Sequence, residues 1–251
     1  MPSSHALSSR FVETTITGDS VLREVLDAVT ERMRYDSAHD PGHLLRVASW
    51  TLRLLDEIPG GQAVERRLAI AAALLHDIVN LPKTDSRRES ASEQSARVAA
   101  KILAGCRLPD DQIKGVCDAI RDHSYTRGAI PRSPLGIALQ DADRLEALGV
   151  IGTFRCIATG VHFGAAFVDS DDPWADRRPL DDKAYSVDHF FTKLLILPPT
   201  LLTHGGRTEA KRRAARMIAL LRGLGEEIET PFVQEVIGEH LPQDFQADGF
   251  Q

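Results

Sequence analysis

The sequence predicts an all-α protein folded as a single-domain helical bundle. Apolar residues recur at the three- and four-residue spacing of amphipathic helices along most of the chain. We find no run of alternating apolar and polar residues bounded by hairpin turns. Residues 68–75 form an eight-residue run without a polar side chain, and it consists mainly of Ala and Leu, which favour helix over strand.

Length and composition allow a sizeable hydrophobic core and argue against a nonspecific nucleic-acid binder. The chain has 251 residues, of which 43% are hydrophobic and 26% are charged, as in globular proteins. The formal net charge is −6, whereas gripping polyanionic nucleic acid nonspecifically requires a basic balance. We therefore expect no nucleic-acid partner, and an anionic substrate must meet a local positive patch.

The cysteines and the hydropathy pattern predict a cytoplasmic protein. Cys106, Cys117 and Cys156 show no CxxC spacing and leave an odd count, which favours free thiols in a reducing compartment. The first ten residues lack the apolar core of a signal peptide, and no stretch approaches 18 uninterrupted apolar residues. We therefore expect no membrane partner.

Capping residues and helix breakers place the expected helices. In DPGHLLRVASWTLRLLDEI, Asp40 suits the N-cap and Pro41 the first helical position, so His43 lies in the first turn. Pro59 and the two glycines after it end this helix. Other helices are expected at residues 21–33, 64–78, 86–103, 110–123, 183–195 and 206–224, with two more within 133–160, broken near Gly149 and Gly152.

The predicted domain organisation has three parts. Residues 1–19 are a polar N-terminal lead, residues 20–225 form the helical bundle, and residues 226–251 form a C-terminal helix and tail. Within the bundle, residues 164–182 are expected to be a long loop, which in a compact domain often carries function. Its cluster of aspartates is not a calcium loop, because the central glycine and closing glutamate are missing.

Four titratable residues stand where the chain should be apolar: His43, His76, Asp77 and Asp141. The helix at residues 64–78 is apolar on all sides and should be central and buried, yet it ends in His76 and Asp77. Buried carboxylates are costly unless a countercharge is present. Two imidazoles and two carboxylates together suit a first-row divalent cation, which would supply that charge.

Each of these residues also has a structural interpretation. A histidine that opens a helix, such as His43, is usually a partly exposed surface group, and Asp141 could cap a helix. Adjacent helical residues point about 100° apart, so His76 and Asp77 can reach one ion only from the end of their helix. Their place just before Pro82, which stops the helix, meets this requirement. The combination of all four residues favours the metal site.

These residues resemble the H…HD…D signature of the HD superfamily of metal-dependent phosphohydrolases. The segments HDPGHLLRV, LLHDIVNLPK, DHSY, QDADRLEALGVIG and RPLDDKAYSVDHFFTKLL resemble a bacterial branch that hydrolyses nucleotides to release pyrophosphate. The likeness covers about residues 20–225. It implies an all-helical fold in which His43, His76, Asp77 and Asp141 bind the metal.

The resemblance also narrows the number of metals and the substrate. HD branches with two metals have two further histidines between HD and the last Asp, whereas this chain has only His123 there. One divalent ion is therefore expected, with Mn²⁺ first and Fe, Co, Ni, Zn or Mg as alternatives. HD monophosphatases commonly have Glu three residues after the HD aspartate, but this chain has Asn80, whose amide cannot act as a general base.

The expected mechanism is attack by a metal-activated water on phosphorus. Asp77 would hold the ion and orient the water, and His123 would act as an acid or donate to a phosphate. Lys83 and Arg127 are candidates to bind phosphate, although Lys83 could equally be a solvated lysine at a helix end. His189 and Lys193, at i and i+4, could reach one ligand from a shared helix face or form an exposed polar face.

Three functions remain open at this point. The first is hydrolysis of deoxynucleoside triphosphates to monophosphate and pyrophosphate, with the attack at the α-phosphorus implied by the family resemblance. The second is a nucleoside-monophosphate phosphatase (5′-nucleotidase), and the third is a regulatory module that binds nucleotide and metal without turnover. In each case the partner is a small-molecule nucleotide, and a homodimer remains open.

Overall fold

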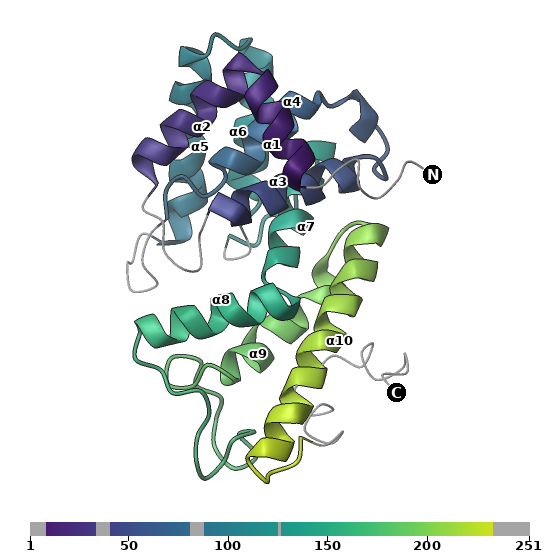
Figure 1. Ribbon diagram of the computed structural model, residues 1–251. Coiled ribbons are helices and arrows are strands. Elements are labelled where there is room, and N and C mark those ends of the chain that lie inside the picture. Colours follow the sequence, from purple (N-terminus) through teal and green to yellow (C-terminus); the bar gives the residue numbers. More distant parts are fainter. Residues whose placement is uncertain (1–8, 34–40, 81–87, 125–126, 233–251) are drawn as a thin grey trace. The chain divides into compact units, whose positions relative to one another are not determined.

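Helices form nearly all the regular structure of the chain. The computed structural model describes residues 9–33, 41–80, 88–124 and 127–232 (Figure 1). Within these ranges it contains no strand, and extended pairing is limited to one parallel bridge between Ala166 and Tyr185. The prediction of an all-α fold is confirmed.

The chain divides into two compact units, where the sequence predicts one bundle. The first comprises Met1–Arg144 and Leu202–Gly205, and the second comprises Leu145–Leu201 and Gly206–Gln251. The division falls within α7 (Pro134–Glu146) and again near the start of α10 (His204–Glu227). Helical periodicity does not reveal the first crossing point, because α7 continues across it from Arg144 to Leu145.

The first unit is a bundle around one buried helix. This central helix is α4 (Arg66–Leu75), whose residues 69–75 are all fully buried, as expected from the apolar run. It packs against α2 (Ser20–Arg32), α3 (Pro41–Leu55) and α6 (Asp110–Asp122). The remaining elements are α1 (Ser9–Gly18), η1 (Gly61–Ala63), η2 (Arg88–Ser90) and α5 (Ala91–Gly105).

The segment expected to be a polar lead contains a helix. In α1, Val12 and Ile16 are buried, and the helix packs against α2 and α3. These two residues are four apart and so lie on one face, which is enough to anchor a short helix. Its threonine hydroxyls bond back to carbonyls four residues earlier, so they do not compete with the helix. Asp19 then caps α2 by accepting from the backbone N–H groups of Val21 and Leu22.

Helix α7 starts at a serine cap and ends at a glycine-dependent turn. The hydroxyl of Ser133 accepts from the backbone N–H of Gly136, and Pro134 follows the cap. Gly149 has a φ of +74° at the start of α8 (Gly149–His162). A Cβ on Gly152 would lie 2.2 Å from the carbonyl oxygen of Ala147, so the close turn requires glycine. The expected break near these two glycines is confirmed.

The second unit combines α8 and α10 with shorter elements. Its short elements are α9 (Asp188–Thr192), η3 (Leu194–Ile196) and η4 (Pro198–Thr200). Trp174 is 1% exposed, its indole N–H donates to the carbonyl of Thr230, and its ring lies 4.8 Å from that of Phe232. The loop around Trp174 is thus fastened to the residues that follow α10.

The helix expected at residues 183–195 is largely replaced by irregular structure. Only Asp188–Thr192 is α-helical, followed by a 3₁₀ turn. Upstream, the Asp181 carboxylate accepts from the backbone N–H groups of Lys183 and Ala184, and Tyr185 forms the bridge to Ala166. These local bonds compete with a continuous helix. In the described part of the chain, no helix has the length and apolarity needed to cross a membrane.

Candidate metal centre

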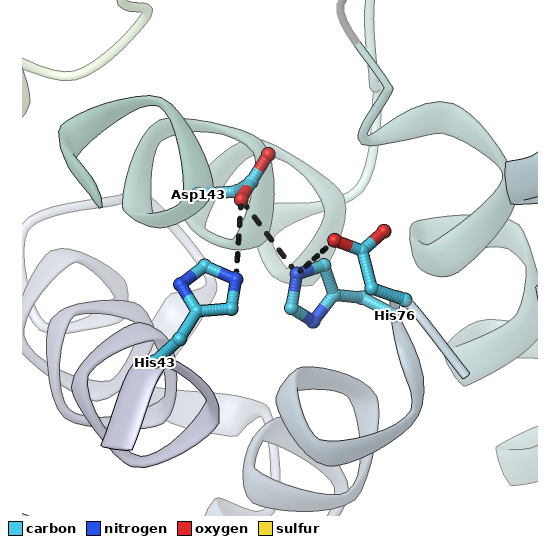
Figure 2. A group of neighbouring side chains, drawn as sticks. His43, His76 and Asp143 are labelled. Carbon is cyan, nitrogen blue, oxygen red and sulfur yellow. Dashed lines mark ion pairs between the residues drawn. The ribbon is translucent and has the colours of Figure 1, made fainter. Parts of the chain in front are cut away.

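Four side chains from three helices of the first unit converge on one point. His43 projects from the first turn of α3, His76 caps the C-terminus of α4 with Asp77 beside it, and Asp143 projects from α7. Each offers one nitrogen or oxygen atom, and these atoms all lie within 4.8 Å of one another. Figure 2 shows Asp143 facing the rings of both His43 and His76.

The spacing of these atoms fits a single metal ion. Nitrogen and oxygen ligands bind zinc and similar divalent ions at about 2.0–2.2 Å, so two ligands of one ion lie at most about 4.4 Å apart. The observed upper limit of 4.8 Å therefore requires only a small contraction. Within the described residues this is the one group of three or more His, Cys, Asp or Glu side chains with such spacing.

The hydrogen bonding of His76 leaves a lone pair directed at carboxylates. Its Nδ1 lies 2.7 Å from the carbonyl oxygen of Ala73, which can only accept, so Nδ1 carries the proton. The opposite nitrogen, Nε2, lies 3.4 Å from Asp77 Oδ2 and 3.6 Å from Asp143 Oδ1. A lone pair facing two anionic acceptors requires either a second proton or a cation, so the donor set fits a divalent metal.

The electrostatics of the cluster show the same need for positive charge. Burial disfavours a charged ring at His76, but the carboxylates of Asp77 and Asp143 outweigh it and raise its pKa well above the usual range. Burial alone would raise the pKa values of both carboxyl groups, yet His76 and its neighbours hold the pKa of Asp77 and of Asp143 well below the usual range. The carboxylates that favour a proton on His76 would equally favour a divalent cation beside it.

The cluster is buried on its histidine side and open on its carboxylate side. The side chains of His43 and His76 are 0% exposed, whereas those of Asp77 and Asp143 are 28% and 27% exposed. Water or a substrate can therefore reach the cluster from the side of the carboxylates, whereas the histidine rings are closed off from solvent. The turn after Asp77 is held in place by Ser95, whose hydroxyl accepts from the backbone N–H of Val79 at 3.1 Å.

The expectation that Asp141 completes the metal site is corrected by the geometry. Its carboxylate accepts from the backbone N–H of Leu202 at 2.9 Å and from the backbone N–H and hydroxyl of Thr203 at 2.8 and 2.7 Å. Two residues along a helix correspond to about 200°, so Asp141 and Asp143 point to opposite sides of α7. Burial raises the pKa of Asp141, opposed by these donors and by the charge of Arg144.

His123, the predicted acid, lies beside the cluster. Its Nε2 is 3.6 Å from Asp77 Oδ1, and its ring centroid is 5.0 Å from that of His76. Its Nδ1 lies 2.6 Å from the carbonyl oxygen of Ile120, so this nitrogen also carries its proton and Nε2 faces the site. The two histidines thus share one arrangement, each at the C-terminal end of its helix.

The predicted phosphate-binding residues are not members of this four-residue group. Arg127 is exposed in the turn after α6, and Lys83 lies outside the described residues, as do Asp40 and Pro82. His189 belongs to the second unit, where its Nδ1 lies 2.8 Å from Asp182 Oδ2. The expected helix face shared with Lys193 is wrong, because α9 ends at Thr192 and Lys193 has a φ of −142°.

Sequence reasoning missed Asp143, although the sequence contains a signal for it. Gln140 is a buried polar residue on α7 whose amide bonds to the end of α6, and Asp143 lies one turn further along the same face. A polar pair at i and i+3 indicates a helix face turned toward other polar groups. Asp141, by contrast, is flanked by Ala138 and Leu145, which are buried with it.

Comparisons with known proteins identify the family of the chain. A model of the HD domain matches residues 42–148. YpgQ of Bacillus subtilis (strain 168) is 30% identical over 196 residues, spanning 76% of this chain and 85% of YpgQ. Its crystal structure in complex with ADP superimposes with a TM-score of 0.62 at 23% identity, covering 82% of this chain and 97% of YpgQ.

A second solved structure with a similar fold is that of a hydrolase. An HD-superfamily hydrolase from Bacillus thuringiensis superimposes with a TM-score of 0.59 at 26% identity, covering 88% of this chain and 97% of the hydrolase. The helical fold and the His/Asp group define the class of the protein, a metal-dependent hydrolase. The chain belongs to the HD superfamily.

Proposed function

We propose that the protein is a one-metal phosphohydrolase that converts deoxynucleoside triphosphates to monophosphate and pyrophosphate. The observation that carries the proposal is the convergence of His43, His76, Asp77 and Asp143 within 4.8 Å, with partly exposed carboxylates on one side. This is the donor set of a hydrolytic metal centre. The proposed ion is Mn²⁺, which nitrogen and carboxylate ligands accommodate together with bound water.

The chemistry needs a nucleophile and a way to move its proton. When bound, a divalent ion supplies a water of lowered pKa and polarises a phosphoryl oxygen. The carboxylate of Asp77 has one oxygen toward His76 and the other toward His123. In this position it can orient the attacking water by accepting one of its hydrogens.

His123 is proposed to supply a proton to the leaving group. Its Nδ1–H is engaged by the carbonyl of Ile120, so a proton gained by the ring is held at Nε2, on the side of Asp77. A positioned acid of this kind contributes about 10²- to 10⁴-fold to rate. A pyrophosphate leaving group carries several negative charges, and protonation makes its departure easier.

The choice of a nucleotide rests on the structural neighbour and on charge. YpgQ, whose fold matches this chain, binds ADP in its crystal structure. With a net charge of −6, this chain needs local cations to hold a triphosphate. We assign that role to Lys83 and Arg127, which belong to the same unit as the four-residue group.

Two alternatives are weaker. Nucleoside-monophosphate phosphatases of this superfamily commonly have Glu at the position of Asn80. The amide of Asn80 cannot act as a general base, which argues against this function. A regulatory module without turnover would be favoured by loss of a ligand, but all four ligand atoms are present. Each alternative predicts a different product.

A product assay distinguishes the three functions. The protein, loaded with Mn²⁺, is incubated with a panel of nucleoside tri-, di- and monophosphates, and pyrophosphate and orthophosphate are resolved. Pyrophosphate released from triphosphates supports the proposal. Orthophosphate from monophosphates supports the phosphatase, and nucleotide binding without product supports the regulatory module.

A further inference from the structure

Gln140 is a buried amide that joins the end of α6 to α7. Its side chain is 1% exposed, and its Nε2 donates to two backbone carbonyls, those of Asp122 and Ala129, each at 3.0 Å. The first carbonyl directly precedes His123, and the second lies beyond the turn that follows. One side chain on α7 therefore ties together both ends of the segment that starts with His123.

The end of α6 needs such a donor. The last carbonyls of a helix have no partner within the helix, and a buried carbonyl without a donor is costly. The amide of Gln140 has two N–H groups and so can satisfy the carbonyls of Asp122 and Ala129 at once. Because the ring of His123 is itself bonded to the carbonyl of Ile120, its direction follows the backbone at this helix end.

We propose that Gln140 is a positioning residue that holds His123 against Asp77. Gln140 and Asp143 lie three residues apart on one face of α7, so a single helix fixes both a metal-binding carboxylate and the end of α6. The 3.6 Å separation between His123 Nε2 and Asp77 Oδ1 thus depends on the amide of Gln140. The inference rests on the proposed function for its catalytic consequence, but the placement of the ring can be measured without turnover.

The closest variant is Gln140→Met, which keeps the length of the side chain and removes both donors. We expect unchanged metal content and a KM within about twofold, with kcat reduced about 10- to 100-fold, because misplacement of a reacting group by about 1 Å can cost 10²-fold. The matched control is Gln112→Met, near the start of α6, where the amide donates to Glu65. Its kcat should equal that of the wild type.

A double-mutant cycle separates positioning from a general loss of stability. If Gln140 acts through His123, the variant Gln140→Met combined with His123→Gln has the same kcat as His123→Gln alone. Multiplied losses in the double variant would overturn the proposal. So would a fall in kcat that is matched in the Gln112→Met control.

A spectroscopic measurement tests the placement even if no nucleotide is hydrolysed. Imidazole ¹⁵N resonances are recorded for the metal-free wild type and Gln140→Met, and His123 is assigned from the signal lost in His123→Gln. We expect the Nδ1–H signal of His123 to shift while that of the exposed His162 does not. Superimposable His123 signals would refute the positioning role, whereas absence of hydrolysis by the wild type would refute the proposed function alone.

Discussion

Two regions of the molecule gather carboxylates, and they neutralise them in different ways. In the first unit, the ion-pair partners that the structure shows for Asp77 and Asp143 are all histidines. In the second unit, the Asp188 carboxylate accepts hydrogen bonds from both terminal nitrogens of the Arg178 guanidinium. The Asp172 carboxylate accepts hydrogen bonds from three successive backbone N–H groups. A carboxylate cluster indicates a metal only when its partners can serve as ligands themselves, and guanidinium cannot.

The largest expected effect comes from replacing the two aspartates of α7 by asparagine, one at a time. Asp143→Asn should lose metal and at least about 10³-fold of hydrolysis, because an amide is a weak substitute for a carboxylate ligand. The matched variant Asp141→Asn should keep its metal and lose stability instead, because it disturbs the bonds to Leu202 and Thr203. Metal analysis and thermal unfolding of both variants check this, and the reverse outcome would restore Asp141 as the ligand.

A smaller effect is expected from the ion pair of the second unit. Arg178→Met leaves the fully buried carboxylate of Asp188 without its guanidinium, and breaking such a pair costs about 3–5 kcal/mol. Urea unfolding measures the loss, while metal content should stay at the wild-type value. Adding Asp188→Asn should recover part of the lost stability, and a double variant less stable than Arg178→Met would contradict this account.

The carboxylate of Asp172 should make stability depend on pH. Burial acts to raise its pKa, but the backbone donors of Asp176, Arg177 and Arg178 lower it below the usual range. A lowered pKa in the folded state contributes stability that is present above the unfolded-state pKa of about 3.9 and lost as pH falls through the folded-state value. The stability difference between wild type and Asp172→Asn should therefore shrink below about pH 4. A difference that is constant from about pH 7 to about pH 2 would exclude this role.

The smallest effect is expected from Thr203→Val. The substitution removes the hydroxyl bond to Asp141 and keeps both backbone bonds, so the free energy of unfolding should fall by about 1 kcal/mol. Metal content and kcat should not change, because Asp143 faces the other side of α7. A loss of metal in this variant would show that the two faces of the helix are coupled.

The sequence predicts the histidine side of the site better than its last carboxylate. His76 and Asp77 stand out because they directly follow an eight-residue apolar run, and that signal is local. Asp141 and Asp143 lie on the same helix, and the donors that engage Asp141 come from residues 202 and 203, about sixty positions away. Helical periodicity contains no information about such a contact, so the sequence alone does not show which of the two aspartates faces the histidines.

The fold shows the same division between local and distant information. The central helix follows from its apolar run, and the turn at Gly149 follows from glycine. The short length of α9 does not follow from the sequence, because hydrogen bonds accepted by the Asp181 carboxylate and the contact between Arg178 and Asp188 override the helical pattern. The helix at residues 9–18 was missed because only Val12 and Ile16 mark its buried face.

The bond between Asp141 and residues 202–203 also bears on how the chain is completed during synthesis. The first unit includes Leu202–Gly205, which supply every hydrogen-bond donor that the structure shows for the Asp141 carboxylate. A nascent chain that has emerged only as far as Arg144 therefore buries this charge without its donors. A fragment cut there is an incomplete domain, and any shortened form of the protein that keeps the metal centre must retain the chain through at least Gly205.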